Sequence, residues 1–166
     1  MARSRKDPRR RAREAALQIL YQWEVGGRDV EQAAETFFTL QWPDVDAPAD
    51  ELRTFASRLS RDTVARLAEI DELIAGTAKR WRPERMAVLD RLILRLAIAE
   101  LLVDADTPPA VVINEALELA RTFTTEESVK FINGMLDAVK KRIEARTQRK
   151  IHHDLCRPSC PSCPSW

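Results

Sequence analysis

The longest apolar stretch of the chain, residues 86–103, predicts the helix around which the rest of the fold packs. Apolar side chains fall on every side of a helix drawn through it, which is typical of a buried helix or a membrane span. Four charged residues, Asp90, Arg91, Arg95 and Glu100, leave no uncharged run of membrane-spanning length. We therefore expect a buried central helix. Asp90 and Arg91 should face outward at one end, whereas Arg95 and Glu100 need partners because unpaired buried charge is costly.

The rest of the chain shows the three-to-four-residue apolar spacing of amphipathic helices, and no stretch alternates at the period of a strand. Asp7, followed by a proline, and Asp29 are expected to be N-caps, and two glycines end the first helix. Thr124 and Thr125 should cap the last helix, with Thr124 and Glu127 as a capping box. The expected ranges are about 8–26, 29–41, 49–67 continuing or restarting over 70–81, 86–103, 110–123 and 125–146.

These elements predict an all-α fold, a bundle of about seven helices in two sub-bundles that share one core. The 166 residues have the length of one domain, which we place at 8–146. The remainder, 147–166, is rich in Cys and Pro and is expected to be a disordered tail. The body has no cysteine for a disulfide, and the charged N-terminus lacks an apolar signal region, so we expect a cytoplasmic protein.

The net charge of +1 hides a strong segregation of charge along the chain. Residues 3–13 carry seven Lys or Arg against one Asp, and residues 140–150 carry six against one Glu. Between them, residues 14–139 have 13 basic and 23 acidic side chains. Basic ends on an acidic body predict a polyanion partner at the ends and a basic protein partner for the body, although merely solvated basic ends would give the same pattern.

Four arginines, Arg9, Arg10, Arg11 and Arg13, occupy the first turns of the first helix, where the helix dipole disfavours cations. An external anion would offset this cost, although a penalty of only a few tenths of a kcal/mol does not by itself require an anionic partner. No phosphate-binding loop, dinucleotide glycine pattern or nucleophile elbow is present. We therefore expect a binding protein with no catalytic residue, metal or cofactor.

Aromatic side chains near basic ones indicate that the polyanion partner is a nucleic acid. Tyr21 lies on the first helix, about three turns after Arg10, and Lys130 and Phe131 lie near the start of the last helix. Bases of single-stranded RNA stack on aromatic rings while cations meet the phosphates. The competing interpretation is that an aromatic residue on a helix packs in the core.

Two pairs of polar residues interrupt otherwise apolar helices, Asn114-Glu115 and Asn133-Gly134, and we expect them to form hydrogen-bond networks between helices.

The C-terminal tail holds side chains that can bind zinc. The spacing of its His and Cys residues matches no standard zinc site, and the prolines of the tail favour disorder. These tail residues are His152, His153, Cys156, Cys160 and Cys163.

Four segments together resemble the NusB family of bacterial transcription antitermination factors. They are RRRAREAALQILYQW (9–23), VLDRLILRLAIAEL (88–101), VVINEALELARTF (111–123) and ESVKFINGMLD (127–137). The resemblance spans about residues 8–145, loosely over 27–80. It implies a helical fold of two sub-bundles and a factor that pairs with NusE, a protein of the small ribosomal subunit. The pair would bind boxA RNA in ribosomal RNA transcripts and help assemble the antitermination complex on RNA polymerase.

The resemblance also implies roles for individual residues. The first-helix arginines (Arg9, Arg10, Arg11 and Arg13) would contact RNA phosphates. Tyr21, Glu127, Lys130 and Phe131 would lie on the same RNA-binding side. The NusE surface would lie around the central helix at Asp90, Arg91 and Leu94. Two alternatives remain open at this point. One is a homodimeric helical interaction scaffold, and the other is a domain of the type fused ahead of RNA cytosine methyltransferases.

Overall fold

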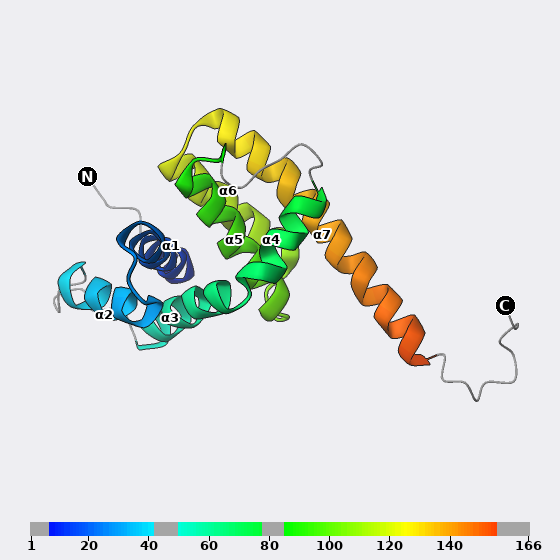
Figure 1. The fold of residues 1–166 in the computed structure, drawn as a ribbon, viewed down its shortest axis with the longest axis horizontal. Coiled ribbons are helices and arrows are strands. Elements are labelled where there is room, and N and C mark those ends of the chain that lie inside the picture. The colour runs from blue at the N-terminus through cyan, green and yellow to red at the C-terminus, as the bar shows by residue number, and fades with distance from the viewer. Residues whose placement is uncertain (1–6, 42–49, 78–84, 156–166) are drawn as a thin grey trace, which may run out of the picture.

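The computed structural model describes residues 7–41, 50–77 and 85–155, with side chains described through Arg149. Within these ranges the chain forms seven α-helices and no strand, so the predicted all-α class is confirmed. Figure 1 shows their arrangement. The helices are α1 (Pro8–Gly26), α2 (Val30–Gln41), α3 (Asp50–Ala65), α4 (Leu67–Thr77), α5 (Val88–Val103), α6 (Pro109–Phe123) and α7 (Glu126–Leu155).

The helix ends follow the local sequence signals, with one correction. The Asp7 carboxylate accepts a hydrogen bond from the Arg9 amide at 3.1 Å, and Gly27 closes α1 in the left-handed region at φ 61°. At the start of α7, the Thr125 hydroxyl accepts a hydrogen bond from the Ser128 amide at 3.2 Å. Thr124 instead ends α6, so the predicted capping box from Thr124 is wrong. The cap lies one residue later, which puts serine, not glutamate, at the third helical position.

Helix α5 lies at the centre of the molecule (Figure 1). Helices α1, α2 and α3 pack on one another, and α6 and α7 pack on α5, with α4 against α5 and α7. Both α1 and α3 also pack on α5. One continuous cluster of buried apolar side chains runs through both groups, which confirms two sub-bundles that share one core.

The deep charges of α5 have partners, as predicted. The Arg95 guanidinium donates to both carboxylate oxygens of Asp71, at 2.9 and 2.8 Å, and to Glu24 at 3.1 Å. These bonds join α5 to α4 and α1. Glu100, 2% exposed, accepts hydrogen bonds from Arg13. Ion pairs on α5 therefore connect it to helices from both sub-bundles.

The other two charges of α5 do not face outward, so that expectation is wrong. Asp90 is 9% exposed and accepts a hydrogen bond from the Ser128 hydroxyl at 2.8 Å. Arg91 is half-buried and donates to Glu24 at 2.5 Å. The first turn of α7 covers Asp90, and the C-terminal part of α1 supplies Glu24. This end of α5 is therefore enclosed by neighbouring helices.

Two expected boundaries differ from the structure. Helices α3 and α4 are separate and meet at Arg66, and α4 begins at Leu67 instead of residue 70. The predicted end of that helix at residue 81 lies outside the described residues. Helix α7 continues through 147–155, which the sequence had assigned to the tail, because no proline or glycine interrupts it there. The cysteines of the tail also lie outside the described residues.

Two classes of feature are absent from the part of the chain that the structure describes. None of the described helices is long and apolar enough to cross a membrane. No three His, Cys, Asp or Glu side chains in these ranges come together as a metal site.

Candidate nucleic-acid interface

The four arginines in the first turns of α1 differ in burial. Arg9 and Arg11 are exposed, and the Arg9 guanidinium donates to the Thr107 hydroxyl at 3.4 Å in the turn before α6. Because successive helical residues are about 100° apart, Arg9 and Arg11 flank Arg10 on either side. Arg9 and Arg11 are therefore the two exposed members of the run.

Arg13 points inward, so the prediction that it contacts RNA phosphates is wrong. Its side chain is 3% exposed, and its guanidinium donates to both oxygens of Glu100, with Nε bonds of 3.1 and 2.9 Å. Burial acts to lower the pKa of Arg13, but the hydrogen bond and the charge of Glu100 outweigh it and the pKa is raised. Arg13 therefore stays charged and joins α1 to α5 inside the core. It also lies over the Phe55 ring of α3, 5.7 Å from its centroid.

Arg10 is half-buried, between the exposed Arg9 and the buried Arg13. Its guanidinium donates to both oxygens of Glu115, at 3.1 and 3.0 Å, and to Glu118 at 3.3 Å. The hydrogen bond to Glu115 is the main cause of its raised pKa. The side chain remains 30% exposed, so α6 fixes its position while its outer edge is open.

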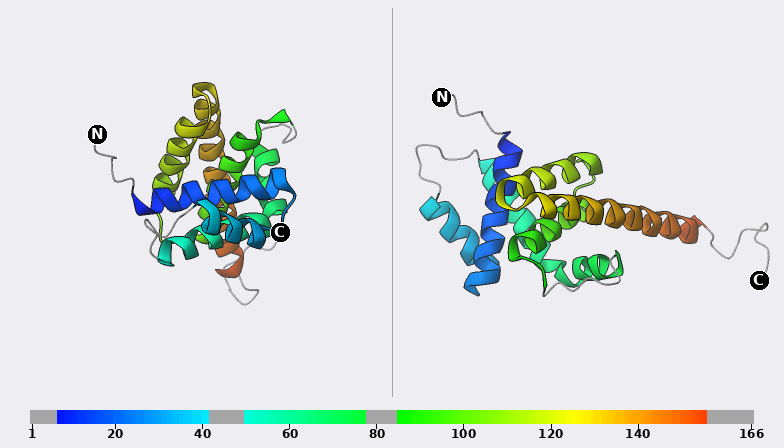
Figure 2. Two further views of the ribbon diagram at one scale, coloured as in Figure 1. Left: turned by 90° about the vertical axis from the view of Figure 1, so that its left-hand side faces the viewer. Right: turned by 90° about the horizontal axis from the view of Figure 1, so that it is seen from above.

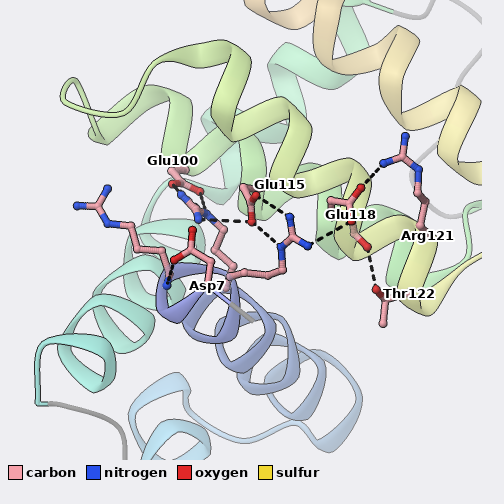
Figure 3. Close-up of polar contacts among 9 residues, drawn as sticks. Asp7, Glu100, Glu115, Glu118, Arg121 and Thr122 are labelled. Atoms are coloured by element: carbon pink, nitrogen blue, oxygen red, sulfur yellow. Dashed lines mark hydrogen bonds and ion pairs between the residues drawn. The ribbon is translucent and has the colours of Figure 1, made fainter. Parts of the chain in front are cut away.

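Carboxylates of α6 position these arginines, and the network expected at Asn114-Glu115 is formed by Glu115. Glu115 is 8% exposed and serves both Arg10 and, at 3.8 Å, Arg13. Glu118 is shared between Arg10 and Arg121, whose side chain is 54% exposed. Figure 3 shows this line of alternating charges from α5 along α6. Arg121 is thus a further exposed cation beside the arginine run, and only its three-residue spacing from Glu118 could have indicated it.

The turn between α5 and α6 supports the Arg9 side of this surface. The Asp104 carboxylate accepts hydrogen bonds from the Thr107 hydroxyl at 2.8 Å and from the Asp106 amide at 3.1 Å. Burial acts to raise the pKa of Asp104, but these hydrogen bonds prevail and hold it below its ordinary value of 3.8. Thr107 is 6% exposed, so the ionised Asp104 fixes the hydroxyl that Arg9 contacts.

Tyr21 follows Arg10 along the same side of α1. The two residues are 11 positions apart, which corresponds to about 20° around the helix and about 16 Å along it. The Tyr21 side chain is 43% exposed, one of the few large aromatic side chains at the surface. The competing expectation, that it packs in the core, is wrong, and its ring is available for stacking.

The start of α7 presents the other predicted aromatic residue. Phe131 is 37% exposed, and its neighbour Lys130 is exposed as well. Glu127, one turn earlier, is also at the surface. All three lie where the sequence predicted them, on the first two turns of α7.

The residues predicted to form a protein-partner surface lie mostly inside the fold. Leu94 is fully buried in the core, so its assignment to an exposed surface is wrong. Asp90 accepts a hydrogen bond from Ser128 and Arg91 is paired with Glu24, and their contact with a partner stays a prediction. The expected polar networks also differ, since Asn114 and Asn133 are exposed and only Glu115 joins helices.

Comparison with known proteins agrees with these features. A model of the NusB family matches residues 10–141. The transcription antitermination protein NusB of Koribacter versatilis is 44% identical over 142 residues, covering 86% of this chain and 94% of that protein. The NusB of Solibacter usitatus is 47% identical over 135 residues, covering 81% and 90%.

Solved structures give the same result at the level of the fold. NusB of T. maritima superposes with a TM-score of 0.71 at 38% identity and covers 82% of this chain and 92% of that one. A chain from a crystal structure of the antitermination factors NusB and NusE in complex with double-stranded RNA has a TM-score of 0.72 at 25% identity, covering 81% and 97%. Because the family model matches residues 10–141 and these relatives are 44% and 47% identical over most of their own length, this chain belongs to the NusB family.

Proposed function

We propose that this chain is a transcription antitermination factor that works as a non-enzymatic RNA-binding protein in the cytoplasm. Together with NusE it binds boxA RNA in ribosomal RNA transcripts and helps assemble the antitermination complex on RNA polymerase. The single observation that carries this proposal is the surface at the start of α1. There α6 carboxylates hold Arg10, with Arg9 and Arg11 exposed beside it, and Tyr21 is exposed farther along the same side of α1. The named relatives and the NusB–NusE complex with RNA support it.

In this proposal the phosphates and the bases meet different residues. Arg9, Arg11 and the open edge of Arg10 neutralise phosphates, because guanidinium groups hydrogen-bond phosphate oxygens in a forked geometry. Bases stack on Tyr21 and Phe131, each worth about 1–3 kcal/mol. On α7, Lys130 contacts a phosphate and Glu127 accepts a hydrogen bond from a base.

NusE is the proposed protein partner, and the acidic body of the chain supports it. Residues 14–139 carry ten more acidic than basic side chains, which favours a basic partner through electrostatic complementarity. The exposed acidic side chains of the body, not α5, are the proposed contact region. Binding of NusE next to the RNA would place two proteins on one strand, so each should tighten the binding of the other.

The test is fluorescence anisotropy of a labelled boxA RNA and a scrambled RNA, with the protein alone and with NusE. We expect selective binding to boxA that tightens with NusE. With three to five phosphate contacts, log K should fall by roughly 2–3.5 per unit of log salt, at about 0.7 per contact on a single strand. Equal weak binding to both RNAs, unaffected by NusE, would overturn the proposal.

A matched pair of variants sharpens this test. Phe131→Ala should weaken boxA binding by about 1–3 kcal/mol through the lost stacking. Leu40→Ala removes another exposed apolar side chain, on α2, and should leave RNA binding unchanged. A tight dimer by light scattering, with no RNA binding even when NusE is present, would support the homodimeric scaffold instead.

A further inference from the structure

Helix α7 extends well beyond the helices that pack on it. It has 30 residues, about 45 Å at 1.5 Å per residue, and its C-terminal part projects from the body in Figures 1 and 2. The root of this projection is fixed to α4. Arg142 donates to the Gly76 carbonyl at 2.5 Å, and Arg146 pairs with Glu72 at 3.3 Å. The projecting segment therefore leaves the body in a defined direction.

This segment, residues 140–150, is here named the basic arm. It carries six basic residues and one acidic residue, Glu144. Lys140 pairs with Glu144 at 3.9 Å, but the exposed side chains of Lys141 and Arg149 have no acidic partner among the described side chains. The Arg149 guanidinium contacts only a carbonyl of its own helix, that of Ala145 at 3.3 Å. Two cations of the arm are thus left for an external anion.

The helix dipole does not account for the basic arm. Cations stabilise a helix when they lie in its last turn, and the effect falls off beyond that turn. Helix α7 ends at Leu155, so Lys141 lies nearly four turns and Arg149 nearly two turns before its end. Charge of one sign so far from the helix end repels itself without gain from the dipole. A ligand of opposite charge would offset this repulsion.

The arm is in register with the candidate RNA residues at the start of the same helix. Lys130 and Lys141 are 11 residues apart, about 20° around the helix and about 16 Å along it. Phe131 and Arg149 are 18 residues apart, which is five whole turns and about 27 Å. Asp137 is exposed between them, and Glu127 and Glu144 lie on the same side, so the positive charge is concentrated at Lys141 and Arg149 and does not run along the whole helix.

We infer that the basic arm is a second RNA-binding site, which contacts the phosphates of single-stranded RNA that flanks the segment held at α1 and the start of α7. This inference rests on the proposed function in one respect, the position of the RNA segment bound at α1 and the start of α7. The affinity of the basic arm for RNA does not depend on it. Lys141 and Arg149 are the contact residues. At a phosphate every 3.4 Å or so along a stacked strand, Lys141 is reached about four to five nucleotides beyond Phe131 and Arg149 about eight.

The experiment compares RNA lengths on the full chain. One RNA is the boxA core of about 12 nucleotides, and the others carry ten added uridines at the 5′ end, the 3′ end or both. A scrambled RNA of the longest length measures binding to the basic arm in the absence of specific boxA binding. The variant is Lys141→Gln with Arg149→Gln. Its control is Arg28→Gln with Arg66→Gln, which removes the same charge from exposed positions outside α7.

We expect the wild-type protein to bind an extended RNA tighter than the core. On the extended RNA the arm variant should lose roughly 5- to 25-fold in affinity near 0.1 M salt, and its salt slope should fall by about 1.4, from about 0.7 per lost contact. On the core RNA it should match wild type within about twofold. The control variant should bind every RNA as wild type does.

Three results would overturn the inference: no gain from added uridines, an unchanged affinity of the arm variant for extended RNA, or an equal loss in the control variant. Failure of the proposed function gives a different pattern. The core RNA would then bind no better than its scrambled form, while the arm variant would still weaken the long scrambled RNA. The melting temperature of each variant checks that its fold is intact.

Discussion

Arg13 and Arg9 lie one turn apart on the same helix, yet their surroundings are opposite. Arg13 is 3% exposed and bound to Glu100 inside the core, whereas Arg9 is exposed and its guanidinium donates to the Thr107 hydroxyl at 3.4 Å. Both belong to one run of four arginines with the same chemistry. Residues four apart share one face of a helix, so the difference arises along the helix axis. Arg13 is level with Glu100 of α5, whereas Arg9, one turn nearer the N-terminus, is level with the turn before α6. The run thus has a buried half and an exposed half.

Removing the partner of the buried arginine should have the largest effect. Glu100→Gln leaves the Arg13 charge buried without a counter-charge, and breaking a buried pair in this way costs about 3–5 kcal/mol. We expect that loss of unfolding free energy in urea titration. Glu35→Gln, at an exposed position of α2, is the control and should change stability by less than about 0.5 kcal/mol.

The double variant Arg13→Met with Glu100→Leu separates charge from packing. Apolar replacement of both partners removes the desolvation cost, so stability should recover most of what Glu100→Gln loses. A Glu100→Gln variant that loses less than about 1 kcal/mol would mean that Arg13 turns to solvent. The contrast between the two arginines would then disappear.

Arg10 should combine both behaviours at a smaller scale. Arg10→Gln removes charge-assisted bonds to Glu115 and Glu118, but the site is 30% exposed, so solvent screening limits the loss to about 1 kcal/mol. Affinity for boxA RNA should fall as well. Urea titration and anisotropy on the same preparation measure the two effects. A change in only one of them would assign Arg10 wholly to the core or wholly to the surface.

The turn beneath Arg9 predicts a pH dependence. The folded protein lowers the pKa of Asp104, so its ionised form contributes stability above the ordinary value of 3.8, and this is lost as the pH falls through the folded value. Asp104→Asn should cost about 1 kcal/mol or less at pH 7, and the difference from wild type should shrink below pH 3.8. Asp106→Asn is the neighbouring control, because only its backbone amide is used. Parallel stability curves for wild type and Asp104→Asn down to pH 2.5 would contradict this.

The exposed half of the run should have the smallest effect on stability. Arg9→Gln with Arg11→Gln should change the unfolding free energy by less than about 0.5 kcal/mol, as exposed substitutions do. The salt slope of boxA binding should fall by about 1.4 for two lost phosphate contacts. A large loss of stability with unchanged RNA binding would reverse the assignment of the two halves.

Part of the candidate site could be read from the sequence and part could not. Tyr21 and Phe131 are exposed as predicted, because their neighbours in the helical pattern supply the buried face. Arg13 was placed wrongly because the pattern of α1 alone gives no sign of Glu100, 87 positions away. Arg121 went unrecognised for the same reason, since its role depends on sharing Glu118 with Arg10.

The sequence by itself determined the helical class, the caps at Asp7 and Asp29 and the central place of residues 88–103, because these depend on local hydrogen bonds and on apolar periodicity. Only the tertiary structure decided which charges face inward. Asp90 and Leu94 lie on a helix that is apolar nearly all round, so the pattern cannot say which side its neighbours cover. Burial of a charge depends on a partner from another helix, and that pairing is fixed only when the helices pack.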